Sequence, residues 1–433
     1  MTSRFLWHVS QITRRMWFRA SLFSILAVVT ALAAIVLAPY IPSDLPTKIG
    51  ADAVDNVLGI IASSMLAVTT FSLSTMVAAY AAATSNVTPR ATKLVMEDTT
   101  TQNVLATFIG SFLYSLVGII ALSTGAYGST GRVVLFVVTA GVIVLIVVTL
   151  LRWIDHLSRL GRVTETTARV EKAATEAMRL HCQQPHMGGC PPADLPASAR
   201  PIYAAKIGYL QHLDVGALSD IAEGGKGRIH VCATPGAFVT PVDPIAFAEG
   251  LDVVEKESDI RACYTIADVR SFDQDPRFGA SVLSEIASRA LSPGINDPGT
   301  AIDVIGRAVR ILAIVTEPAD PQRDVAFPRV HIPPIDVADL FDDLFTPIAR
   351  DGAGVVEVGV RLQKAMLILS RLGPAEFAEN AARHSKLALQ RASRGLALEH
   401  DLAILRDLAA KVERERDLRQ SGQGSKAGGP KGG

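Results

Sequence analysis

The chain has 433 residues, of which 49% are hydrophobic and only 19% are charged, and its mean hydropathy is +0.31. This composition is too apolar for an ordinary soluble enzyme. The formal net charge of zero argues against a nucleic-acid-binding protein, because phosphate contacts need a cationic excess. The first 151 residues hold only eight of the 42 Lys and Arg and five of the 42 Asp and Glu. The sequence therefore predicts an N-terminal membrane part and a larger soluble part.

Four segments are long and apolar enough to cross a bilayer, whose hydrocarbon core of about 30 Å needs roughly 20 apolar residues in a helix. They run over residues 20–38, 57–83, 104–125 and 133–151. We expect residues 20–151 to form a four-span transmembrane domain. Residues 1–19 mix Arg with aromatic side chains and are expected to lie at the membrane interface.

The distribution of basic residues predicts the orientation of the spans, because Lys and Arg are retained on the cytosolic side during insertion. Basic residues precede the first span, lie between the second and third, and follow the fourth: Arg4, Arg14, Arg15, Arg19, Arg90, Lys93, Arg152, Arg159 and Arg162. Trp7, Trp17 and Trp153 lie beside the spans on the same side, where indoles favour the headgroup layer. Both termini are therefore predicted to be cytosolic.

Small and hydroxylated residues recur along one face of the second predicted span. Ser63, Thr70, Ser74 and Ala78 follow one another at helical spacing and so share a stripe. Bulky side chains form a stripe on another side: Leu66, Leu73, Met76 and Tyr80. Small faces let membrane helices pack closely, here most simply against the third span. The alternative is that hydroxyls from several copies line a water-filled path.

None of the four predicted spans contains an Asp, Glu, Lys, Arg or His. Buried charges are what ion-coupled and proton-coupled transporters use within the membrane. A passive pore, or no pore, is therefore favoured over a charge-coupled pump.

Residues 152–200 predict an amphipathic helix to about residue 181 and then a linker rich in Pro and Gly. Two His and two Cys in this linker, His181, Cys182, His186 and Cys190, have the residue types of a tetrahedral zinc site. The spacing lacks a CxxC knuckle, and adjacent residues cannot easily bind one ion together. We therefore expect an irregular linker and no metal or other cofactor.

The rest of the soluble part divides into an α+β arrangement. Short alternating runs with Pro-Gly turns predict a small β-rich module over residues 201–270. Apolar stripes predict a helical domain over residues 271–418, with helices near 335–349, 353–372, 374–395 and 398–418 after a Pro-rich connector at 318–334. The low-complexity residues 419–433 are expected to be a disordered tail.

Two helices of the helical domain are predicted to begin with the same signal. Asp275-Pro276 and Asp297-Pro298 each place an acidic cap before a proline at the first helical position. Capping alone explains both aspartates. The functional alternative places Asp273, Asp275, Asn296 and Asp297 around one polar cleft for a cation or polar ligand. A membrane enzyme would need these carboxylates to converge, and the sequence contains no P-loop, GxGxxG, HExxH or GxSxG motif. We expect no enzymatic activity.

The runs FSLSTMVAAYAAATSNVTPR, TFIGSFLYSLV, GYLQHLD, FDQDPRFG and, most specifically, RALSPGINDPGTA resemble the bacterial membrane-protein family called domain of unknown function 2254. The resemblance covers residues 5–415. The family-like positions are Ser72, Ser74, Pro89, Arg90, Gly208, Tyr209, Asp275, Phe278, Gly279, Pro293, Asn296, Asp297 and Pro298. It implies a multi-span protein of the bacterial inner membrane with a cytosolic C-terminal region, and it implies no particular activity.

Two functions remain open on the sequence. The leading hypothesis is a homo-oligomeric, channel-like pore in the lipid bilayer, lined by the second span and assembled or gated by the cytosolic region. The alternative is a membrane-anchored regulatory or scaffolding protein without a pore, which would bind a cytosolic protein partner.

Overall fold

The computed structural model describes residues 3–37, 51–125, 129–317 and 325–421. The chain divides into two compact units. His8–Thr166 form the first, here called the membrane unit, and Met1–Trp7 with Thr167–Gly433 form the second, here called the C-terminal unit.

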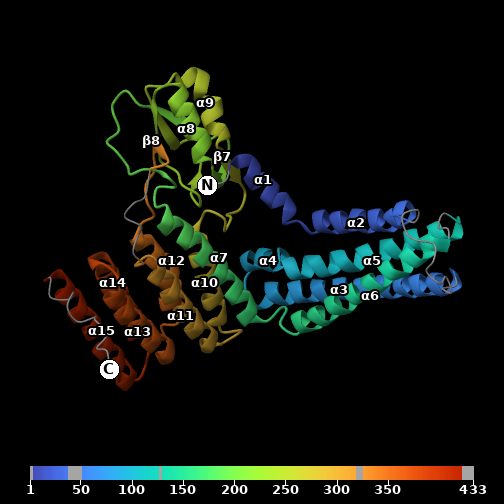
Figure 1. Ribbon diagram of the computed structural model, residues 1–433. Helices are drawn as coiled ribbons and strands as arrows, with labels where there is room; N and C mark the ends of the chain where they lie inside the picture. The colour runs from blue at the N-terminus through green and yellow to red at the C-terminus, as the bar shows by residue number, and fades with distance from the viewer. Residues whose placement is uncertain (1–2, 38–50, 126–128, 318–324, 422–433) are drawn as a thin grey trace, which may run out of the picture. The chain divides into compact units, whose positions relative to one another are not determined.

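The membrane unit is built from long apolar helices that lie side by side (Figure 1). In chain order these helices are α2 (Met16–Leu37), α3 (Ala51–Asn86), α5 (Thr99–Ser123) and α6 (Ser129–Leu157). The unit also contains the short helix α4 (Pro89–Met96) and the part of α1 (Arg4–Thr13) from His8 on. Among the described residues three of them, α3, α5 and α6, are long and apolar enough to cross a membrane. The first predicted span corresponds to α2, which would complete a fourth span together with α1, although the two helices are bent by 71°. Residue 38 of that predicted span lies outside the described residues.

Helix α5 is the centre of the membrane unit. In its apolar window 61% of the residues are buried, against 28% for α3 and 22% for α6. Its glycines allow neighbours to approach closely: a Cβ at Gly110 would lie 3.3 Å from the Phe23 carbonyl oxygen, and one at Gly118 would lie 3.0 Å from Leu58 Cδ1. These glycines give α5 a small face that packs closely against α2 and α3.

The C-terminal unit begins along α7 (Val163–Gln183) and continues into a β module made of two sheets. One sheet has the strand order β1-β8-β4-β6-β2, and the other has the order β5-β3-β7. The strands are β1 (Gly189–Cys190), β2 (Arg200–Tyr203), β3 (Gly208–Leu213), β4 (Arg228–Val231), β5 (Phe238–Val239), β6 (Pro244–Glu249), β7 (Tyr264–Ala267) and β8 (Phe327–His331). Two short helices, α8 (Val215–Gly224) and α9 (Val253–Ala262), connect them.

Two strands of the module come from segments predicted to be irregular. Strand β1 lies in the predicted linker, and β8 lies in the predicted Pro-rich connector. Strand β8 pairs in parallel with both β1 and β4, with Ile229 opposite Val330. The predicted boundaries of the module were therefore too narrow, because a central strand arrives from about 60 residues beyond residue 270.

The remaining chain forms the predicted helical domain. Its helices are α10 (Pro276–Ala290), α11 (Pro298–Ile314), α12 (Val337–Asp351), α13 (Val356–Leu372), α14 (Ala375–Gly395) and α15 (Glu399–Gln420). Helices α12 to α15 lie together (Figure 1), and their core is aromatic: Phe341, Phe345 and Phe377 are at most 1% exposed. The end of α15 overlaps the start of the predicted tail, whose residues from 422 on lie outside the described residues.

Candidate functional site

The stripe of small residues on α3 lies on the open surface of the membrane unit. Ser63, Thr70, Ser74 and Ala78 are all exposed. The side of α3 that packs inside the unit is the opposite one, where Ile61, Met65, Ser72 and Met76 are at most 7% exposed. The interpretation that the stripe packs against the third span is therefore wrong, because the opposite face makes that contact.

The predicted bulky stripe is divided between these two environments. Met76 is 2% exposed and belongs to the packed face, whereas Leu66 and Leu73 are 54% and 45% exposed. Together with Ile60 and Phe71, which are also exposed, they leave the small stripe as a shallow strip between bulkier apolar side chains. Such a surface lets the backbone of another helix approach closely.

Each hydroxyl of the stripe donates its proton within its own helix. Ser63 Oγ donates to the Gly59 carbonyl, Thr70 Oγ1 to that of Leu66, and Ser74 Oγ to that of Thr70, each at 3.0 Å. Because a hydroxyl has one proton and two lone pairs, the outward side of each oxygen offers only acceptor capacity.

Ser72 has a different role from its neighbours on the stripe. It is fully buried, and its Oγ accepts a hydrogen bond of 2.9 Å from the indole of Trp153. Trp153 is 2% exposed, so this residue is packed inside the membrane unit rather than placed at its surface as an interfacial anchor. Trp17, at 57% exposed, is available for that role.

In the C-terminal unit, Asp273 and Asp275 have separate structural partners. Asp275 caps α10 through the Phe278 amide at 3.0 Å and accepts two hydrogen bonds from Arg270, at 2.7 and 2.9 Å. The carboxylate is 2% exposed, and burial raises the pKa of Asp275 while the Arg270 and Phe278 hydrogen bonds act against that rise. The Gly236 turn, with φ of 98°, presses on this carboxylate so closely that a Cβ would lie 2.5 Å from Oδ2.

Asn296 and Asp297 lie at the other end of α10. Asp297 caps α11 through the Thr300 amide and hydroxyl, at 3.1 and 2.6 Å, and it is exposed. Asn296 precedes it with φ of 51°, a left-handed conformation that suits Asn. Since α10 has 15 residues, its two ends are separated by about 22 Å. The structure therefore does not bring the four residues into one cleft, and both aspartates act as caps.

The N-terminal residues of the chain bind the β module, a contact that the sequence analysis missed. The Arg4 amide donates to Asp214 Oδ2 at 2.5 Å. The Trp7 indole donates to Asp273 Oδ2 at 3.2 Å and stacks on His212 with a ring separation of 5.2 Å. Trp7 is 7% exposed, so the prediction that this residue lies in the headgroup layer is wrong. Nothing local in the sequence signals a partner more than 200 residues away.

The linker residues considered for zinc are spread over different contacts. Among the residues that the structure describes, no group of three or more His, Cys, Asp or Glu could hold a metal ion. His186 Nδ1 lies 2.7 Å from the Ile332 carbonyl, and Cys190 Sγ donates to the Pro328 carbonyl at 3.5 Å. Burial and the nearby His186 lower the pKa of His181 to about 4.

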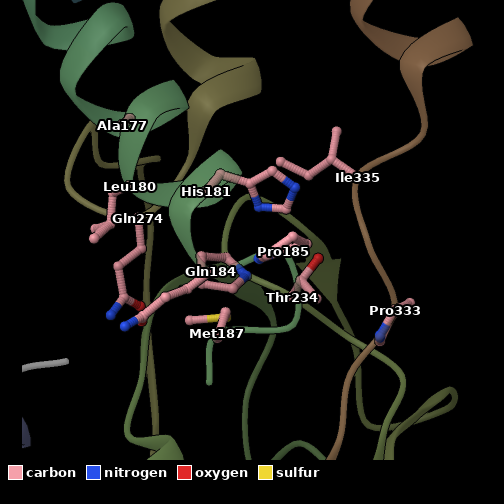
Figure 2. Close-up of a pocket in the computed structure, with 11 residues that line it drawn as sticks. Ala177, Leu180, His181, Gln184, Pro185, Met187, Thr234, Gln274, Pro333 and Ile335 are labelled. Atoms are coloured by element: carbon pink, nitrogen blue, oxygen red, sulfur yellow. The ribbon is translucent and has the colours of Figure 1, made fainter. Parts of the chain in front are cut away.

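His181 also lines a small cavity that Thr234, Pro185 and Gln274 share with it (Figure 2). The cavity has a volume of about 30 Å³. That is room for one or two water molecules and not for a substrate.

The long-range strand β8 creates a second polar cluster that the sequence did not reveal. The rings of His230 and His331 stack 4.8 Å apart, and His230 Nε2 lies 2.9 Å from Glu249 Oε2. This hydrogen bond is the largest of the causes that lower the pKa of Glu249. The sequence could have indicated this cluster only if β4 had been paired with a strand that lies about 100 residues later in the chain.

Apolar helices suited to a bilayer, joined to a folded α+β unit, define a polytopic membrane protein. The profile of the predicted membrane proteins called domain of unknown function 2254 matches residues 13–367, and the chain belongs to this family. Uncharacterised proteins of Mycobacterium bovis and Mycobacterium tuberculosis are 27% identical over 286 residues, which cover 62% of this chain and 54% of each relative. The chain thus spans about half the length of these curated relatives. No solved structure matches it.

Proposed function

We propose that the chain forms a homo-oligomeric, channel-like pore in the bacterial inner membrane, with the α3 stripes of several copies facing one another. The observation that carries the proposal is the exposure of the whole stripe on the side of α3 opposite to its packed face. A helix that uses one face inside its own unit and keeps a small, hydroxylated face outside is suited to contact a second copy.

The chemistry of the stripe supports a passive, uncharged path. Its hydroxyl protons are used within α3, so the path would present oxygen lone pairs and no charge. Acceptor oxygens favour water or a partly hydrated cation over an anion.

The proposed orientation places both termini in the cytosol, on the basis of the Lys and Arg distribution. The C-terminal unit would then assemble or gate the pore from the cytosolic side. The C-terminal unit binds the first residues of the chain through Arg4 and Trp7. Because these residues continue along the chain into α2, a movement of this unit could be transmitted directly to that helix.

The test combines subunit counting with electrical recording of the purified full-length protein in planar bilayers. We expect a defined oligomer with a conductance, and we expect Ser74→Leu to reduce that conductance while the oligomer remains. Val147→Leu, at a position on α6 that is 49% exposed, is the matched control and leaves the conductance unchanged. A monomer that conducts nothing contradicts the proposal.

One observation favours the alternative of a membrane-anchored scaffold without a pore. The stripe hydroxyls already bond to carbonyls of their own helix, so they can face lipid without a large desolvation cost. In that case no condition would open a conductance, whatever the oligomeric state. A cytosolic protein partner would bind the C-terminal unit.

A further inference from the structure

A groove in the membrane unit opens between α2, α5 and α6, away from the α3 stripe. Its volume is about 400 Å³, within the range of ligand-binding pockets. Each helix contributes the same pattern of four residues, at positions i, i+3, i+4 and i+7 counted from Phe23, Thr107 and Val138. At 1.5 Å per residue the groove therefore extends for about 10 Å along the helices.

The groove walls are mostly apolar, and three of the hydroxyls on its lining, those of Thr30, Thr107 and Tyr114, already have partners inside the unit. The Thr30 hydroxyl donates to the Leu26 carbonyl and that of Thr107 to the Asn103 carbonyl, both at 2.8 Å. The Tyr114 hydroxyl lies 3.0 Å from Thr139 Oγ1. The Ser111 hydroxyl is the remaining one on the lining, and a single hydroxyl offers fewer than the two to four polar partners that an ordered water needs. Its occupant is therefore an apolar group.

On the α6 side of the groove, Gly141 has no side chain and leaves the groove open. A Cβ at Gly141 would meet no atom within 4 Å, so the space over this residue is open. Two of the groove's three helices, α5 and α6, are long and apolar enough to cross a membrane, and hydrocarbon chains surround such helices at this depth.

A cation stands just beyond one end of the groove. Arg19 precedes Phe23 by one helical turn on α2, and Asn103 precedes Thr107 by one turn on α5. Arg19 Nη1 donates to Asn103 Oδ1 at 2.7 Å, so the guanidinium bridges the two helices at the level of the groove mouth. No carboxylate among the described residues pairs with Arg19, which leaves its charge available for an anionic oxygen.

We infer that the groove binds one acyl chain of a phospholipid, with the lipid phosphate on the Arg19 guanidinium. An apolar groove that ends at the Arg19 guanidinium complements an amphiphile with an apolar chain and an anionic head. The inference does not depend on the proposed pore, because the groove and the α3 stripe share no residue.

The test is native mass spectrometry of the delipidated full-length protein titrated with phosphatidylglycerol or with the diacylglycerol of the same chains. Wild-type protein is expected to bind phosphatidylglycerol about tenfold more tightly than the diacylglycerol, which is the ratio of affinities that one charge-assisted hydrogen bond provides. Arg19→Gln should remove this preference while some binding of both lipids remains. Gly141→Phe, which fills the groove, should remove binding, and Val147→Phe, outside the groove on the same helix, should not.

Two results would overturn the inference. Equal lipid binding by Gly141→Phe and Val147→Phe would mean that no chain occupies the groove. Loss of the oligomer in Gly141→Phe with lipid binding unchanged would assign the groove to a second copy of the chain. Should Gly141→Phe not fold, Arg19→Gln alone decides, since unchanged preference for the phosphate-bearing lipid contradicts the site.

Discussion

Acidification from pH 7 to pH 5 is expected to loosen the helical bundle α12–α15 through His384. This imidazole is 2% exposed and lies among Phe341 and Phe345, with its Nε2 3.1 Å from Asp342 Oδ1. Burial, aided by the positive charge of Arg383, lowers the pKa of His384 from 6.5 to about 4. The nearby carboxylate opposes this shift and is outweighed by it.

The sign and size of the effect follow from proton linkage. Because the folded-state pKa is depressed, the unfolded state binds the proton first, so stability is complete above pH 6.5 and is lost as the pH falls towards 4. With these two pKa values the loss at pH 5 is about 2 kcal/mol, and it approaches about 3 kcal/mol at pH 4.

Hydrogen exchange of the full-length protein measures this loss locally. Peptides from α12 and α14 should lose about thirtyfold in protection between pH 7 and pH 5, after correction for intrinsic exchange. His384→Phe keeps an aromatic ring of similar size and removes the titrating group, so its protection should change little. His400→Gln, an exposed histidine at the start of α15, controls for loss of an imidazole. Equal acid sensitivity of wild type and His384→Phe would refute the reasoning.

Two further predictions compare residues of the same type in different environments. Asp275→Ala should destabilise the C-terminal unit by about 2–3 kcal/mol, because it leaves the partly buried Arg270 without its partner and removes the buried cap of α10. Asp297→Ala removes an exposed cap and should lower the free energy of unfolding by about 1 kcal/mol. Chemical denaturation, followed by a spectroscopic signal from the C-terminal unit, measures both losses. Equal losses for the two variants would contradict the assignment of Asp275 as a buried cap and Asp297 as an exposed one. In the membrane unit Ser72→Ala should cost about 1–2 kcal/mol, because a buried indole N–H loses its acceptor. Ser74→Ala on the exposed stripe should leave thermal stability in detergent unchanged, and a loss as large as that of Ser72→Ala would argue for a packed role.

The sequence predicted the features that depend on local periodicity. The helices expected near 335–349 and 374–395 are α12 and α14, displaced by no more than two residues at any end. Their apolar stripes repeat over several turns, which makes the helical signal strong. The caps at Asp275 and Asp297 could also be predicted, because an acidic residue directly before a proline is a local signal for the start of a helix.

The features that the sequence missed depend on distant partners. Strand β8 has only five residues and is recognisable as a strand only when β1 and β4 are beside it. Like an interfacial tryptophan, Trp7 has a nearby Arg and apolar residues around it in the sequence. Only its distant partners, His212 and Asp273, show that it packs on the β module instead. For α3 the periodicity found the small face but could not tell which face packs inside, because lipid and protein interior are equally apolar.

Disulfide crosslinking along α3 in native membranes tests most directly whether copies of the chain meet at the stripe. Single cysteines would be placed at exposed positions of α3 in a chain whose four native cysteines are replaced by serine. The account predicts crosslinked dimers for cysteines at 63, 70, 74 and 78, and much weaker crosslinking at Leu66 and Leu73, which flank the stripe. Crosslinking without this helical period, or none at any stripe position, would contradict it.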